Sequence, residues 1–171
     1  MDNNYGGAIA VIPKGTVITG NIETKGRLEM YGEIRGNITS TDALNIEGDI
    51  FGDIHASEIC MKEGFVKGKI EADNGVTIQQ NTVVLGDVSA ETLQIDGAVQ
   101  GNLDVKGCVT IGETAIVDGD VSSKSIQIQN GAVISGRYSQ VYAEVSPEEY
   151  FAEKESESNI KIGKSEKKKN K

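Results

Sequence analysis

The sequence predicts an all-β protein, built as a single-domain, right-handed parallel β-helix. Two observations predict this fold: a short signature centred on glycine recurs along the chain, and apolar residues fall into columns once the chain is aligned on that signature. The composition agrees, because the 171 residues include 21 glycines, only 2 prolines, no tryptophan and 5% aromatic residues. Frequent glycine with abundant Ile and Val favours many short strands joined by tight turns.

The signature is a glycine followed, in most copies, by Asn or Asp and then by an aliphatic residue. Its eight copies are separated by 16, 16, 16, 18, 15, 18 and 17 residues. They begin at Gly20, Gly36, Gly52, Gly68, Gly86, Gly101, Gly119 and Gly136. Only the fourth copy, with Lys69, and the last copy, with Arg137 and Tyr138, depart in residue type. Such a glycine suits a corner where the backbone adopts a positive φ.

Alignment on the glycines produces three apolar columns and one column of small residues. Two residues before the glycine stand Ile18, Ile34, Ile50, Val66, Val84, Val99, Val117 and Ile134. Two residues after it stand Ile22, Ile38, Ile54, Ile70, Val88, Leu103, Val121 and Tyr138. A third side consists of the alternating pairs Leu28/Met30, Leu44/Ile46, Ile59/Met61, Val76/Ile78, Leu93/Ile95, Val109/Ile111 and Ile126/Ile128. Four residues after the glycine come mostly small residues, including Ser40, Ala56, Ala72, Ala90 and Ser123.

Strict alternation of apolar and polar residues is typical of strands, so each repeat holds three short strands. This describes about eight coils of roughly 16–17 residues each, stacked in parallel around a shared interior. An antiparallel sandwich or barrel is the alternative, but it needs turns every ~8–12 residues and no recurrence of residue type in every coil. A left-handed β-helix needs about 18 residues per coil. The shorter coils break that period, and parallel crossovers prefer the right hand.

We expect three segments along the chain. Residues 1–10 form a flexible N-terminal tail, residues 11–143 form the β-helix, and residues 144–171 form a C-terminal tail. The run Ser146-Pro147-Glu148-Glu149 resembles a capping box, which predicts a possible short helix over 147–157 before a disordered Lys-rich end. Met1–Gly7 lacks the pattern of a signal peptide, and no apolar run approaches the ~20 residues of a membrane span. The expected location is therefore the cytoplasm.

The charge is unevenly distributed. The net charge of −9 lies entirely within residues 1–143, because residues 144–171 contain seven Lys and seven Glu. An acidic body repels phosphates, so we expect no nucleic-acid partner. The last eleven residues reverse the sign with Lys161, Lys164, Lys167, Lys168, Lys169 and Lys171. This end is a candidate for contact with the anionic inner face of the cell membrane, and the alternative is a solubilising tail.

The repeated segments resemble those of the bactofilins, a family of bacterial cytoskeletal proteins. The resemblance rests on Gly36-Asn37-Ile38, on the run from Gly48 to Ile54, on Gly119-Asp120-Val121, and on the layout of one β-helix between short tails. It covers roughly residues 11–143. It implies a triangular right-handed β-helix that polymerises without nucleotide into non-polar filaments, which associate with the inner membrane surface and position cell-shape or envelope proteins. Met1–Tyr5 does not look like the membrane-targeting peptide with which many bactofilins begin.

The terminal coils are the candidate polymerisation interfaces. The ends of a β-helix have strands without partners and interior side chains without a covering coil, and open edges are templates for pairing. The candidate residues are Val11, Ile12, Ile134, Tyr138, Val141 and Tyr142. A second candidate surface lies on the side of the rod, where Phe51, Phe65, Val83 and Leu85 occupy outward positions. It is a possible patch for lateral bundling, a membrane or a partner.

The residues predict no catalytic, cofactor or metal site. Hexapeptide-repeat acyltransferases share β-helix geometry and typically use a His as general base, but the only histidine here, His55, is predicted to face solvent. Cys60 and Cys108 form no metal-binding cluster, and their expected separation of three coils, ~14 Å, is too long for a disulfide. A filament-forming scaffold is the leading prediction; a β-helical acyltransferase and a monomeric β-helical adaptor are the alternatives.

Overall fold

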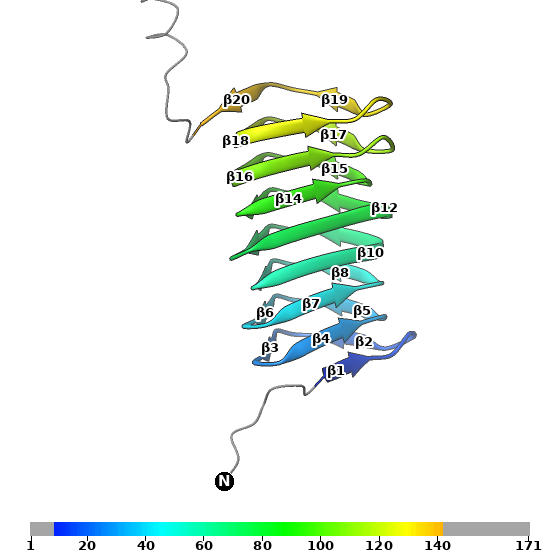
Figure 1. The fold of residues 1–171 in the computed structure, drawn as a ribbon. Coiled ribbons are helices and arrows are strands. Elements are labelled where there is room, and N and C mark those ends of the chain that lie inside the picture. The colour runs from blue at the N-terminus through cyan, green and yellow to red at the C-terminus, as the bar shows by residue number, and fades with distance from the viewer. Residues whose placement is uncertain (1–8, 142–171) are drawn as a thin grey trace, which may run out of the picture. The chain divides into compact units, whose positions relative to one another are not determined.

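The computed structural model describes residues 9–141, which fold into 20 strands of a single sheet wound into a parallel β-helix. Figure 1 shows the chain rising from β1 to β20, with one set of strands running from left to right at the front and the others returning behind them. This winding is right-handed. The structure confirms the all-β parallel β-helix of about eight coils, and no helix occurs within residues 9–141.

Three faces, which we call A, B and C in the order the chain visits them, make up each coil. Face A holds β1 (Ile9–Ile12), β4 (Arg27–Met30), β7 (Ala43–Ile46) and β14 (Thr92–Ile95). Face B holds β2 (Val17–Thr19), β5 (Glu33–Arg35), β8 (Asp49–Phe51), β15 (Ala98–Gln100), β17 (Ile116–Asp118) and β19 (Val133–Ser135). Face C holds β3 (Ile22–Thr24), β6 (Ile38–Ser40), β9 (Ile54–Ala56), β11 (Ile70–Ala72), β13 (Val88–Ala90) and β20 (Tyr138–Gln140).

Four longer strands turn a corner without interruption. The strands β10 (Glu58–Lys67) and β12 (Gly75–Leu85) continue from face A to face B. The strands β16 (Leu103–Ile111) and β18 (Val121–Ile128) continue from face C to the face A of the next coil. We number the coils 1 to 8 from β1, so coil 1 is β1–β2–β3 and coil 8 ends with β20.

The strand register reproduces the predicted columns. Ile18 pairs with Ile34, which pairs with Ile50, and this face B column continues without slippage to Ile134. The face C column from Ile22 to Tyr138 is equally regular. Away from the ends these side chains are almost completely buried, so they form one continuous apolar core along the rod.

The signature builds the corner between faces B and C. Gly52 has a φ of +154°, and a Cβ added to it would lie 2.2 Å from the carbonyl oxygen of Gly36 in the coil below. The next residue provides a side-chain ladder, because the Asp53 amide donates to Asn37 Oδ1 (2.9 Å) and Asp53 Oδ1 accepts from the Lys69 amide (2.9 Å). Glycine therefore permits close stacking, and Asn or Asp ties each corner to the next.

The corner between faces A and B carries a second column of small residues, which the sequence prediction missed. Its members are Thr16, Gly32, Gly48, Gly64, Thr82, Gly97, Ala115 and Ala132, each four residues before a signature glycine. A Cβ on Gly48 would lie 2.0 Å from the carbonyl oxygen of Gly32, so the glycines of this column permit close stacking. The alignment on the signature glycines already contains this column of small residues.

The β-helix begins earlier than predicted. The first strand starts at Ile9, so two residues assigned to the N-terminal tail belong to the β-helix, where Ile9 and Ala10 pair with Arg27 and Leu28. Through this pairing with β4, the sheet begins two residues before Val11. Tyr142, the predicted helix over 147–157 and the Lys-rich end lie outside the described residues.

Candidate assembly interfaces

The C-terminal end of the rod exposes core positions. Ile134 and Tyr138 belong to the inward columns, yet they are 36% and 42% exposed, whereas Ile34 and Ile50 in the same kind of position are fully buried. Ile128, an inward residue of face A that was not among the predicted interface residues, is 51% exposed. The cause is the same for all three, because no further coil covers coil 8 within the described residues.

Polar groups occupy one corner of this end. The Tyr138 hydroxyl lies 3.1 Å from Ser123 Oγ, and Gln140 Nε2 donates to the Lys124 carbonyl oxygen at 3.0 Å. Val141 is partly buried, and its amide donates to the Ser123 carbonyl oxygen at 2.9 Å. The end surface is therefore apolar over faces A and B and polar near the corner between faces C and A.

The two candidates at the N-terminal end lie on opposite sides of β1. Ile12 points inward, pairs with Met30 and is only 8% exposed. Val11 pairs with Glu29, points outward on face A and is 54% exposed beside Ile9. Ile12 therefore lies within the core at this end of the rod, and Val11 belongs to the outer surface. Ile18 and Ile22, which the prediction did not list for this interface, are partly buried and complete the end of the core.

Backbone edges are open at both ends. Within residues 9–141, the strands β1, β2 and β3 pair only with the coil above, and β19 and β20 pair only with the coil below. Each edge presents amide and carbonyl groups in the geometry of a parallel ladder, which is the geometry that another strand would recognise.

The four lateral candidates come together on face B. The rings of Phe51 and Phe65 lie 5.9 Å apart between centroids, Phe65 pairs with Val83, and Leu85 lies two residues further along the same strand. Phe51 and Val83 are each 40% exposed. The patch continues toward coil 8 through residues three before a signature glycine that the prediction overlooked: Ala98, Ile116 and Val133.

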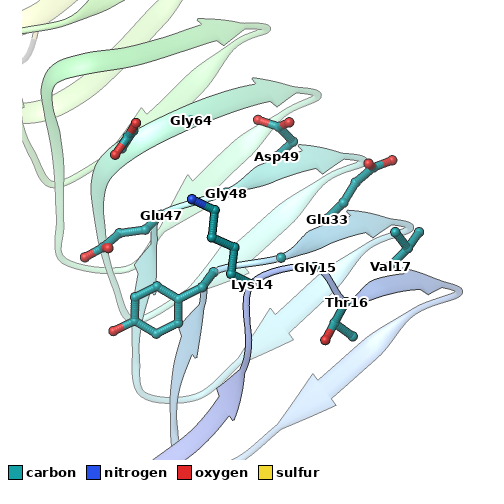
Figure 2. A pocket seen from close by; sticks show the side chains of 12 residues that line it. Lys14, Gly15, Thr16, Val17, Glu33, Glu47, Gly48, Asp49 and Gly64 are labelled. Carbon is teal, nitrogen blue, oxygen red and sulfur yellow. The ribbon is translucent and has the colours of Figure 1, made fainter.

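A groove runs along the corner between faces A and B in the first four coils (Figure 2). Gly32, Gly48 and Gly64 leave its floor without side chains, and the loop from Lys14 to Val17 borders it. The carboxylates along it belong to Glu33, Glu47, Asp49 and Glu63.

The charges around this groove are partly paired. Lys62 Nζ lies 3.5 Å from Glu47 Oε1, and Arg35 Nε lies 2.6 Å from Glu33 Oε1. The Tyr31 hydroxyl donates to Glu29 Oε2 at 3.3 Å, and the negative charge of Glu29 raises the pKa of Tyr31. These groups are solvated, and the groove is a consequence of the stacked glycines.

His55 faces solvent on face C, as predicted. Its Nε2 lies 3.4 Å from Asp73 Oδ1, and its side chain is 46% exposed. The nearest serine in its column, Ser89, is two coils away with Glu71 between them, a separation of about 9.6 Å at the usual strand spacing. Direct proton transfer between Ser89 and this histidine requires hydrogen-bond contact, which that separation does not allow.

The cysteines are separate thiols. Both Cys60 and Cys108 are free and partly buried. They do not share a column, because the column of Cys60 continues through Thr77 and Gln94 to Thr110 in coil 7, two residues beyond Cys108. Burial raises the pKa of the Cys60 thiol, which lowers its thiolate fraction at neutral pH. Within residues 9–141, no group of three or more His, Cys, Asp or Glu side chains is placed to hold a metal ion.

Comparison with known proteins yields one match. A family model described as bactofilin, polymer-forming cytoskeletal, matches residues 10–89 and 49–139. None of the curated proteins and none of the solved structures matches the chain. In the part of the chain from Ile9 to Val141, no helix is long and apolar enough to cross a membrane.

Proposed function

The chain belongs to the bactofilin family of polymer-forming cytoskeletal proteins, and on that premise we propose that it assembles without nucleotide into filaments that scaffold cell-shape or envelope-associated proteins. Its role in this proposal is structural and not enzymatic. The single observation that carries the proposal is the apolar core that remains open at the C-terminal end, at Ile128, Ile134 and Tyr138.

End-to-end stacking is the contact that this geometry favours. Complete burial of a large apolar side chain contributes about 1.5–3 kcal/mol, and the three exposed core side chains of coil 8 already lie in the columns that another coil would extend. The open edges of the end strands add backbone hydrogen bonds to the same contact. These driving forces need no bound nucleotide. The interface of this proposal comprises Ile12 at one end and Ile128, Ile134, Tyr138 and Val141 at the other.

A pair of substitutions on adjacent residues tests the end interface. Tyr138 points into the end of the core and Ser139 points outward on the same strand, where it pairs with Ser122. We expect Tyr138→Glu to abolish filaments in electron micrographs of the purified protein without nucleotide, and we expect Ser139→Glu to leave them intact. Ile134→Glu is a second disruptive variant, and circular dichroism establishes that each variant is folded.

Three results would contradict the proposal. Filaments unchanged in both Tyr138→Glu and Ile134→Glu would remove the end coil from the interface. A wild-type protein that stays monomeric at all concentrations would favour an adaptor. A discrete trimer would favour a β-helical acyltransferase.

We further propose a cytoplasmic location, at the inner face of the membrane, through the Lys-rich end. Each Lys near an anionic lipid surface contributes about 1 kcal/mol, and residues 161–171 contain six. Co-sedimentation with vesicles containing phosphatidylserine is expected for the full chain and is expected to be lost on deletion of residues 158–171. Equal binding by both forms would contradict this assignment.

A further inference from the structure

Face B carries a continuous apolar column on its outer surface. From coil to coil, Phe65 pairs with Val83, Val83 with Ala98, Ala98 with Ile116, and Ile116 with Val133. We call these five residues the apolar stripe; Val83, Ile116 and Val133 in it are 40%, 53% and 57% exposed. The stripe runs parallel to the rod from coil 4 to coil 8.

The outer column of face C provides a comparison at the same levels. Its residues in coils 4 to 8 are Glu71, Ser89, Asp104, Ser122 and Ser139, in unbroken register. The inward residues two before and two after the signature glycine are apolar and at most 2% exposed in coils 4 to 7: Val66, Val84, Val99 and Val117 on face B, and Ile70, Val88, Leu103 and Val121 on face C. Strand formation and core packing therefore do not require apolar residues on the outside, and a contiguous exposed patch of this kind marks an interaction surface.

We propose that the apolar stripe is a lateral interface between two copies of this chain, packed face B to face B with their rod axes antiparallel. A two-fold axis that lies between the two rods and runs parallel to the strands places each outer column opposite the same column of the other copy. The order of the coils is reversed across the interface. With the axis between coils 5 and 6, Phe65 of one copy lies opposite Ile116 of the other, and Val83 lies opposite Ala98. Four of the five stripe residues then pack apolar against apolar, while Val133 in coil 8 lies opposite Asp49 in coil 3 of the other copy.

Charge complementarity selects this orientation and register. In the neighbouring outer column of face B, Lys67 belongs to coil 4 and Asp118 to coil 7. The same two-fold axis places Lys67 of one copy opposite Asp118 of the other. Parallel rods would instead place Lys67 against Phe65 and Asp118 against Ile116, which desolvates both charges without a partner.

The chemistry of the surface also favours a second copy over a lipid surface. Residues 1–143 carry the whole net charge of −9, and an acidic body is repelled by anionic lipids.

The stripe itself is small: five coils at ~4.8 Å and a strand of three residues at ~3.3 Å give about 240 Å². A stable interface buries about 800 Å² on each partner.

Lateral pairing therefore depends on polymerisation. Isolated chains offer too little area to pair, but end-to-end assembly repeats the stripe in every subunit, and weak contacts along two filaments add together. In this respect the inference rests on the proposed function. It assigns the stripe to the pairing of filaments and the open ends of the core to their growth.

Electron microscopy of filaments without nucleotide tests the interface. We expect Val83→Glu and Ile116→Glu to convert paired filaments into single filaments. The matched controls Ser89→Glu and Ser122→Glu add the same charge in the same coils on face C, and we expect them to leave pairing intact. The milder variants Val83→Ser and Ile116→Ser serve where the Glu variants fail to fold, and we expect the same loss of pairing.

A charge exchange tests the antiparallel register. Lys67→Asp alone and Asp118→Lys alone are each expected to reduce the fraction of paired filaments, because like charges then face each other. The double variant Lys67→Asp/Asp118→Lys is expected to restore it.

The outcomes separate this inference from the proposed function. Paired filaments that persist in all face B variants would overturn the lateral interface while leaving filament formation intact. The lateral interface would also be overturned if wild-type filaments stay single and bind phosphatidylserine vesicles, while the face B variants do not bind them. The stripe would then be a membrane-binding surface. A wild-type protein without filaments would instead contradict the proposed function.

Discussion

Faces B and C are built alike on the inside and differ on the outside. Ile50 and Ile54, two residues on either side of Gly52, are both buried in the same coil. Outside, coil 7 presents Ile116 on face B and Ser122 on face C. Since one face folds with polar outer residues, the apolar residues of the other are not needed for folding. The comparison teaches that the inward columns set the fold and the outward columns set what the rod contacts.

The largest expected effect lies at the corner that joins the two faces. Gly52→Ala imposes strain at a φ of +154° and a clash with the Gly36 carbonyl oxygen. We expect it to lower the free energy of unfolding by about 2–6 kcal/mol, from strain and overpacking together. Gly20 has a φ of +130° but no heavy atom within 4 Å of an added Cβ, so Gly20→Ala should show the strain alone. Equal losses in chemical denaturation would show that stacking does not require glycine.

The inner columns should be equivalent. Ile50→Ala on face B and Ile54→Ala on face C each remove a fully buried side chain from coil 3. We expect each to lower the free energy of unfolding by about 2–5 kcal/mol, with nearly the same value for both. Urea denaturation of the two variants under conditions without filaments measures this. A much smaller loss for one face would break the equivalence on which the comparison rests.

The outer columns should hardly affect folding. Ile116→Ser on face B and the reciprocal Ser122→Ile on face C exchange the surface characters of coil 7. Both side chains point away from the core, so we expect the free energy of unfolding to change by less than about 1 kcal/mol in each. The same denaturation experiment checks it. A loss of several kcal/mol for Ile116→Ser would assign the stripe to folding and not to assembly.

A modest effect is expected for the ladder at the corner between faces B and C. Asp53→Ala removes the acceptor of the Lys69 amide, and we expect a loss of about 0.5–1.5 kcal/mol. Lys69 interrupts the ladder because its side chain accepts no hydrogen bond. Lys69→Asn offers an acceptor to the Asp87 amide and should raise the midpoint of unfolding slightly. The gain is reduced by loss of the exposed ion pair between Lys69 and Glu71, which contributes little. A lower midpoint for Lys69→Asn would show that the ladder contributes nothing at this coil.

Much of the fold was predictable because neighbouring coils repeat the same positions. The inward columns, the glycine corner and the outward His55 all follow from period-two alternation counted from each signature glycine. The start of the β-helix was wrong by two residues, because the strand at Ile9 precedes the first signature and has no repeat before it to align with. The small residues at the corner between faces A and B were overlooked, although the same alignment contains them.

The sequence by itself determined which side chains point into the rod, since that depends on residues within one coil. Only the tertiary structure decided which residues beyond an irregular corner become neighbours, because the signature glycines are 15 to 18 residues apart and the extra residues fall at different corners. The placement of Cys60 and Cys108 in different columns arises in this way, because the register shifts between Met61 and Glu63 and between Val105 and Cys108. Positions near the signature glycine are set locally, and positions beyond an irregular corner are set by stacking.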